Sequence, residues 1–133
     1  MAGFGRQAGS RRRSLAAAGL AVVLAGCGAT EAERHPMAGA SAAEGRRVIA
    51  RVGCASCHDI PGVDWPRGRT GPSLNGFADR PLIAGRLPNE PDLLAAYVRD
   101  ATRFTPRSGM PPMPLTDTEA RDVAAYLYTL KPE

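Results

Sequence analysis

Two cysteines and a histidine lie close enough in this sequence to act together on one group. The five residues from Cys54 to His58 read CASCH, which is the pattern C-x-x-C-H. Two thiols one helical turn apart can add to the two vinyl groups on one edge of a haem, and the adjacent imidazole then lies under the iron. The spacing therefore predicts one covalent haem c, held by thioethers at Cys54 and Cys57, with His58 as an axial ligand.

Two other chemistries use cysteines at this spacing. A redox-active C-x-x-C of the thioredoxin kind belongs to a βαβ pattern, and no segment here alternates apolar and polar residues over a useful length. A zinc site needs a fourth ligand, and only His35 and Cys27 remain to supply it. The plainest alternative is a buried His58 beside two inert cysteines, and the pattern favours haem over all three.

A second axial ligand must come from elsewhere in the chain. A methionine thioether would stabilise ferrous iron and raise the reduction potential. The segment Met110–Pro114 holds the two methionines nearest the end of the chain, and its prolines stiffen the loop that presents them. The alternative role for both is apolar packing. Local sequence alone leaves the choice between Met110 and Met113 open.

Three segments show helical spacing and are expected to position these ligands. The first follows Ser41, the second begins near Asn89 and the third follows Thr116. Ser41 and Thr116 each have a glutamate three residues later, which is a capping-box pattern. Apolar residues then recur at helical intervals, as in Val48, Ile49 and Val52; Leu94, Tyr97, Val98 and Ala101; and Val123, Tyr126, Leu127 and Leu130. The predicted fold class is all-α.

The segments between these helices are long loops. Residues 59–76 and 104–114 are rich in glycine and proline, and loops of this length in a compact domain usually have a function. Three short helices alone would give a thin core. A haem, which is large, flat and mostly apolar, would complete the interior.

The chain resembles the class I cytochromes c over residues 44 to 130. It is especially similar to the cytochrome c domain fused to subunit II of some haem–copper oxidases, and to free monohaem relatives. The residues that carry the resemblance are Gly45, the Cys54–His58 motif, Gly71-Pro72-Ser73-Leu74, Ile83–Asn89, Met110-Pro111 and Ala125-Tyr126-Leu127. The resemblance implies three main helices plus long loops wrapped around one covalent haem c.

The resemblance also implies roles for individual residues. Met110 would be the distal ligand, and Met113 a packing residue. The Pro72 carbonyl would accept a hydrogen bond from the His58 ring and fix it for metal binding. Gly45 would let the first helix cross the last closely, against Tyr126.

Three further side chains in the first loop are expected to lie near the haem. Arg67 and Arg69 are candidate partners of a haem propionate, and the sequence does not choose between them. Trp65 is expected to pack against the haem wall.

The N-terminal segment is predicted to be a leader. Arg6 to Arg13 is basic, and the apolar run Leu15–Gly26 would rise only about 18 Å as a helix, short of a roughly 30 Å bilayer core. Leu24-Ala25-Gly26-Cys27 resembles a bacterial lipoprotein box, which implies cleavage before Cys27 and acylation of its thiol. The expected organisation is a lipoprotein signal peptide over 1–26, a flexible tether over 27–40 and a cytochrome c domain over 41–133.

Charge excludes a nucleic-acid partner. The net charge is +4, but the four arginines before Cys27 account for it, and 13 basic residues face 13 acidic ones from Cys27 onward. A mature chain without a basic excess lacks the electrostatic footprint of a nucleic-acid-binding protein.

These features predict an electron carrier rather than an enzyme. Iron bound by His58 and Met110 would have no open position, so the expected function is electron transfer on the periplasmic side, anchored by lipid and serving a respiratory chain. Its redox partner would be a terminal oxidase or a periplasmic dehydrogenase, and the protein a monomer or a subunit of a complex. The alternatives are a haem-bearing subunit without a free existence and a haem enzyme or gas sensor with a labile distal ligand.

Overall fold

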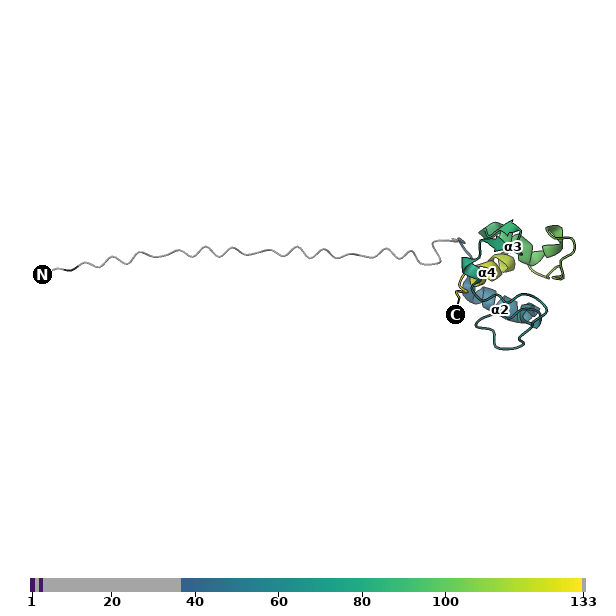
Figure 1. The fold of residues 1–133 in the computed structure, drawn as a ribbon, viewed down its shortest axis with the longest axis horizontal. Coiled ribbons are helices and arrows are strands. Elements are labelled where there is room, and N and C mark those ends of the chain that lie inside the picture. The colour runs from purple at the N-terminus through teal and green to yellow at the C-terminus, as the bar shows by residue number, and fades with distance from the viewer. Residues whose placement is uncertain (2, 4–36, 133) are drawn as a thin grey trace.

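Three helices and two long loops form the described part of the chain. The structure is a computed structural model that describes Met1, Gly3 and residues 37–132, so Cys27 and the predicted leader lie outside the described residues. Helix α4 (Asp117–Leu127) packs against both α2 (Ala42–Val52) and α3 (Pro91–Arg99). In Figure 1, α4 accordingly lies between the other two helices. The predicted helical architecture is confirmed.

Helix α2 begins and ends where local chemistry dictates. The Ser41 hydroxyl accepts a hydrogen bond from the Glu44 N–H at 3.3 Å, which satisfies one of the free amides at the start of the helix. Gly53 ends the helix in the left-handed conformation, with φ of 77°, which a glycine adopts without strain. The chain therefore leaves α2 in a defined direction, directly into Cys54.

Helix α4 has the complete capping box that its sequence predicts. The Thr116 hydroxyl accepts from the Glu119 N–H, and the Glu119 carboxylate accepts from the Thr116 N–H at 2.9 Å. These backbone and side-chain hydrogen bonds from Thr116, and then the charge of Arg51, lower the pKa of Glu119. The ionised carboxylate thus contributes stability above its ordinary pKa, and this contribution is lost as the pH falls through the lowered value.

Helices α2 and α4 cross at a glycine. A Cβ atom on Gly45 would overlap the Asp122 carbonyl oxygen and lie 2.5 Å from the Asp122 carbonyl carbon. The close crossing predicted at Gly45 is therefore present, but it faces the Asp122 backbone rather than Tyr126. Asp122 also accepts a hydrogen bond from the Ser41 N–H at 2.7 Å, which fixes the start of α2 beside α4.

A short hairpin, which the sequence patterns did not predict, precedes α3. Strand β1 (Leu82–Ile83) pairs antiparallel with β2 (Leu87–Pro88). Strands of two residues are too short to show an alternating pattern. Buried Asn89 ties this hairpin to the rest of the domain, because its amide donates to the Arg80 carbonyl at 2.8 Å and accepts from the Tyr128 hydroxyl at 3.0 Å.

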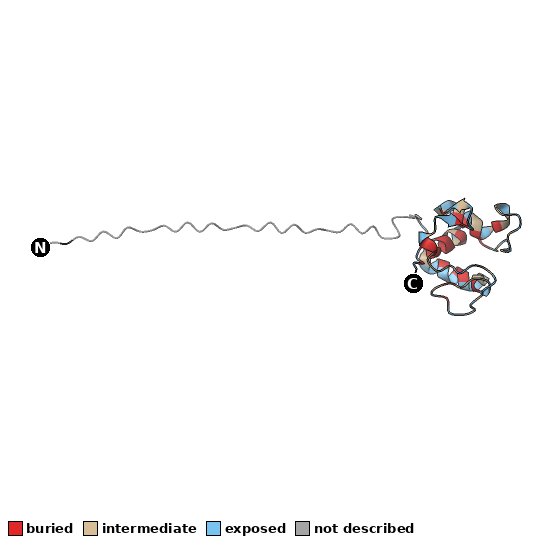
Figure 2. Cartoon of the chain, in the orientation of Figure 1, coloured by how far each residue is buried: buried red, intermediate tan, exposed pale blue. Residues whose placement is uncertain are grey.

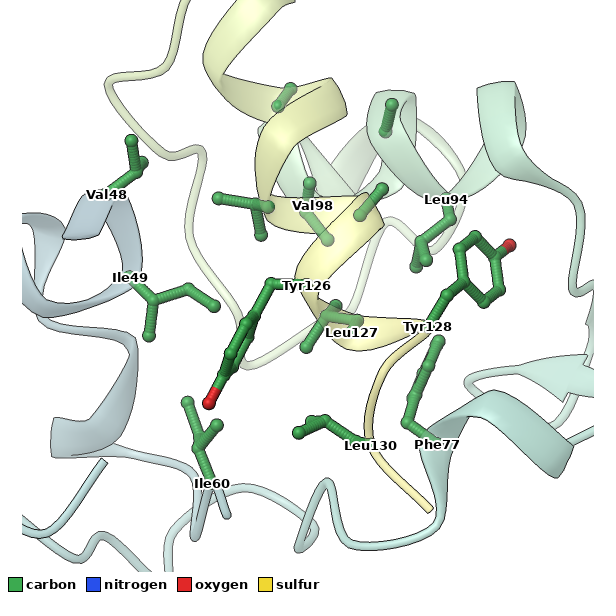
Figure 3. Packing of buried hydrophobic residues seen from close by; sticks show 14 of the residues in the cluster. Val48, Ile49, Ile60, Phe77, Leu94, Val98, Tyr126, Leu127, Tyr128 and Leu130 are labelled. Carbon is green, nitrogen blue, oxygen red and sulfur yellow. The ribbon is translucent and has the colours of Figure 1, made fainter. Parts of the chain in front are cut away.

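The hydrophobic core lies on both sides of α4. Figure 2 shows α4 mostly buried, while the outer face of α2 is exposed. In Figure 3, Ile49 of α2 and Ile60 of the first loop approach Tyr126 from one side, and Leu94 of α3 lies on the other. Burial raises the pKa of Tyr128, at the edge of this core, to about 12, so its hydroxyl remains protonated at neutral pH.

The segment before α2 also contacts the domain. Met37 is partly buried against the core, and the Ala38 carbonyl lies 3.5 Å from the Arg121 guanidinium, which donates to it. Residues 37–40, expected as the end of the tether, therefore lie against α4. Within the described residues, no helix is both long and apolar enough to cross a bilayer.

Candidate haem site

The motif Cys54–His58 lies in a tight turn at the end of α2. Cys54–Ser56 forms a 3₁₀ turn, in which the amides of Cys57 and His58 both donate to the Cys54 carbonyl, at 3.2 and 3.1 Å. Ala55 is buried under this turn, whereas Cys57 is exposed and Cys54 is half-buried. The turn thus places both cysteines at one end of α2, with Cys57 the more exposed of the two.

One hydrogen bond of His58 indicates which of its two ring nitrogens carries the proton. Its Nδ1 lies 2.8 Å from the Pro72 carbonyl oxygen. A carbonyl only accepts, so Nδ1 carries the proton and donates it, and the Nε2 lone pair is free for a metal. Partners of this kind hold the imidazole orientation in metal sites and raise its basicity. The contact between His58 and Pro72 that the family resemblance implies is present.

Two glycines bring the first loop back onto this turn. The Gly68 N–H donates to the Ala55 carbonyl and the Gly71 N–H to the Cys57 carbonyl, both at 2.8 Å. A Cβ on Gly68 would lie 2.5 Å from the Cys57 carbonyl carbon, and one on Gly71 would lie 2.5 Å from Cε1 of His58. The backbone of the loop therefore packs directly against the motif at Gly68 and Gly71, where any side chain larger than that of glycine would clash.

Substitution of Gly71 with alanine should weaken the hold of His58 on iron. The new methyl group would lie 2.7 Å from Nδ1, so the ring must shift away from the Pro72 carbonyl. Loss of such a partner typically costs 10–100-fold in metal affinity, so acid should displace His58 at a pH about one to two units higher. The Soret band during an acid titration measures this. The control is Gly109→Ala, whose Cβ would contact nothing within 4 Å; equal titrations of both variants would contradict the expectation.

The two motif cysteines differ in burial. Cys54 is the more buried of the two, and this burial raises the pKa of its thiol. Both Cys54 and Cys57 are free thiols rather than a disulfide. Across residues 37–132, no three His, Cys, Asp or Glu side chains are grouped to bind one metal ion.

The second loop places its two methionines differently. Both side chains are half-buried against the core. The Met113 N–H donates to the Arg99 carbonyl at 2.8 Å, which ties residue 113 to the end of α3. The Met110 N–H donates only to the nearby Ser108 hydroxyl, at 3.1 Å. The backbone at Met113 is therefore tied to the end of α3, whereas the Met110 N–H is bonded only within its own loop.

The polar and aromatic residues of the first loop are exposed. Arg67 and Arg69 border a hollow of about 450 Å³ that Asp59, Gly71 and Ser73 also line. Trp65, expected to pack on the haem wall, is 85% exposed. It is absent from the half-buried apolar residues that border the core, namely Met37, Ala42, Val52, Cys54, Leu74, Leu87, Leu93, Tyr97, Met110 and Met113.

Comparison with known proteins decides the family. Residues 42–131 match the protein family described as Cytochrome c. This chain belongs to the cytochrome c family. The match runs from the start of α2 to just beyond α4, so it includes the motif, the clamping loop and both methionines.

Two curated relatives support this assignment. The chain is 32% identical over 89 residues to cytochrome c oxidase subunit 2 of Alkalihalophilus pseudofirmus, which covers 66% of this chain but only 25% of that protein. It is 33% identical over 84 residues to cytochrome c-552 of Bradyrhizobium diazoefficiens, which covers 63% of this chain and 70% of that protein. The chain thus spans a quarter of the first relative and most of the second.

Family membership establishes the general chemistry. A cytochrome c binds haem c and transfers electrons. The residues of this chain fit that group, because the Pro72 contact leaves Nε2 of His58 free and the two cysteines lie three residues apart in the turn directly before His58. Haem supplies an iron that changes oxidation state, while the protein sets its potential through axial ligands and burial.

Proposed function

We propose that this cytochrome carries one haem c, attached through Cys54 and Cys57, with His58 and Met110 as axial ligands. The observation that carries the proposal is the geometry of His58: Nδ1–H is committed to the Pro72 carbonyl, and the motif backbone is held by the returning loop. Met110 is preferred over Met113 because the family resemblance places the distal ligand there, six residues before Thr116, which caps the last helix.

With both axial ligands in place, the protein is an electron carrier and not an enzyme. His58 and Met110 would fill both axial positions, so no substrate reaches the metal. Ala55 is buried, and the hydrogen bonds from Gly68 and Gly71 to the motif carbonyls fix the motif backbone. A site that changes little between redox states transfers electrons with a small reorganisation cost.

The cytochrome is proposed to work on the periplasmic side of a membrane, as a lipoprotein. The support is the sequence: a basic segment, a short apolar run and the LAGC box that ends at Cys27. Acylated Cys27 and the segment up to residue 36 would then tether the domain. Its redox partner would be a terminal oxidase or a periplasmic dehydrogenase of a respiratory chain.

Mass spectrometry of the native protein tests the attachment and the export together. The expected mass is that of residues 27–133 plus one haem and acyl chains, with the haem retained after denaturation. Substitution of Cys54 and Cys57 with serine should make the haem extractable by acidified solvent. A colourless, stably folded protein with both thiols free would contradict the proposal.

A second candidate is a haem-bearing subunit of an oxidase complex. The similarity to the protein from Alkalihalophilus pseudofirmus that is named cytochrome c oxidase subunit 2 favours it, although the chain matches only 25% of that protein. In that case the cytochrome would copurify in fixed ratio with an oxidase after mild detergent extraction. A free carrier would separate from the oxidase as the salt concentration rises.

A further inference from the structure

The residues directly before α2 form an ordered turn. The Ala40 N–H donates to the Met37 carbonyl at 3.1 Å, and Gly39 between them has a φ of 76°. A positive φ at the third residue is typical of a type II turn, in which glycine is the preferred residue at that position. Residues 37–40, named the exit turn below, therefore have a defined shape.

The exit turn is held against α4. Met37 is partly buried against the core, and the Ala38 carbonyl accepts a hydrogen bond from the Arg121 guanidinium at 3.5 Å. Directly after the turn, the Ser41 N–H donates to the Asp122 carboxylate at 2.7 Å. These contacts fix, relative to α4, the point at which the preceding chain must leave the domain.

The motif lies at the opposite end of α2 from the exit turn. The exit turn precedes the helix, whereas Cys54 follows Gly53, which ends it. A helix of 11 residues is about 16 Å long. In Figure 1 the described chain enters the domain at the left, and the first loop, which follows the motif, lies at the lower right. The full length of α2 therefore separates the motif from the point where the chain enters.

The length of chain before the exit turn limits how an acylated domain can sit on a membrane. Nine residues, 28–36, separate Cys27 from Met37, and the ten steps between these two Cα atoms span at most about 35 Å. A domain of this size is about 30 Å across. With the motif turned toward the bilayer, the chain would have to pass along the whole domain, stretched nearly to its limit. A stretched chain has few conformations, so this orientation is entropically unfavourable.

We propose that the exit turn and the adjacent part of α4 form the membrane-proximal face of the lipoprotein, with the motif held at the distal end. This inference rests on the proposed acylation of Cys27 and on the proposed haem at the motif. The motif then stands between about 16 and 50 Å above the lipid surface, the lower bound set by α2 and the upper by α2 plus the extended chain. The redox partner that fits this arrangement is a protein whose electron-exchanging surface projects above the bilayer.

An oxidant fixed in the headgroup plane tests the orientation. The reduced, acylated holoprotein is reconstituted in phosphatidylcholine vesicles that carry a ferrocenium group on a small fraction of the headgroups. One electron passes from each ferrous haem to one ferrocenium, which leaves ferric haem and ferrocene, and the haem absorption band follows the reaction. The wild type should react slowly, because the motif is held away from the headgroups.

A longer tether should remove this restriction. Insertion of about twelve glycine and serine residues after Pro36 should speed oxidation by ferrocenium lipid by about tenfold or more, since the linker can then span both orientations. The matched control carries the same insertion after Glu133 and should react like the wild type. Ferricyanide, which is dissolved in the water, should oxidise all three proteins at the same rate. Equal rates with ferrocenium lipid for the wild type and the long-tether variant would overturn the inference.

The contacts of the exit turn are tested by a second pair of variants. Met37→Ser combined with Arg121→Gln should free the turn and speed oxidation by ferrocenium lipid, though less than the insertion does. Arg99→Gln is its control, because Arg99 pairs with Asp117 as Arg121 pairs with Asp92, between the same two helices, without contact to the turn. A double variant no faster than this control would overturn the role of the exit turn.

Vesicle binding separates a failure of this inference from a failure of the proposed function. Wild-type holoprotein should sediment with the vesicles, and Cys27→Ser, which cannot be acylated at that position, should not. A wild type that stays in solution would contradict the proposed lipid anchor, and the orientation would fall with it. A wild type that binds the vesicles and reacts with ferrocenium lipid as fast as the long-tether variant would contradict the orientation alone.

Discussion

Replacement of Met110 with alanine is expected to abolish the sulfur-to-iron absorption band at the red end of the visible spectrum and to lower the reduction potential. A thioether stabilises ferrous iron, so its loss favours the ferric form. The fall should be on the order of a hundred millivolts, within the roughly 0.8 V range that axial ligands span. A redox titration of the purified holoprotein measures the potential, and rapid carbon monoxide binding should appear because a coordination position opens.

Met113→Ala is the matched control for this substitution. Both methionines lie in the same loop and are half-buried against the core, so both truncations remove similar apolar area. The Met113 N–H keeps its bond to the Arg99 carbonyl in the variant, because that bond uses only the backbone. Met113→Ala should therefore lose some stability but keep the red band. If the band disappears in Met113→Ala and survives in Met110→Ala, the assignment of the distal ligand is wrong.

The helices could be predicted from sequence because their signals are local. Ser41 and Thr116 have their capping glutamates three residues later, and both cap a helix in the structure. Pro91, allowed in a first turn, begins α3. The hairpin at 82–88 has no such signal, because strands of two residues carry no periodicity. Asn89, which follows the hairpin, bonds to Arg80 and to Tyr128, and the partner Tyr128 is 39 residues away in the chain.

The motif in the candidate site could be predicted from sequence, but only part of the structure that supports it could. The pattern from Cys54 to His58 is contiguous, so its spacing alone indicates the chemistry. The role of Pro72 came from the family resemblance, and the structure places its carbonyl 2.8 Å from the His58 ring. The clamp through Gly68 was missed, because glycine in a loop usually means only a turn. The available signal is a pair of glycines three residues apart, Gly68 and Gly71, in the loop that follows the motif.

Tertiary contacts also decide the expectation that the structure changes. The resemblance implies that Gly45 faces Tyr126, but the helices cross one turn earlier along α4, at Asp122. Tyr126 instead reaches the Pro61 carbonyl and holds the start of the first loop. Helical periodicity shows which face of a helix is buried, and it does not show which turn of the neighbouring helix lies opposite.

Substitution of Gly45 with alanine is expected to destabilise the domain severely. In an isolated helix this change would stabilise by about 1 kcal/mol, because alanine has the higher helix propensity. Here the Cβ would overlap the Asp122 carbonyl oxygen and lie 3.0 Å from the Val123 nitrogen. These are backbone atoms of α4, so relief requires the two helices to separate and unpack Val48 and Ile49.

The net loss should be about 3 kcal/mol in the free energy of unfolding, at the upper end for overpacking a core. For a domain of this size it corresponds to a melting temperature lower by about 10 °C or more. Ala50→Gly, on the exposed face of the same helix, is the control and should cost only about 1 kcal/mol. The turn that carries Cys54 follows α2 directly, so its position depends on how α2 packs against α4. A Gly45→Ala variant as stable as wild type would contradict the expected clash at this crossing.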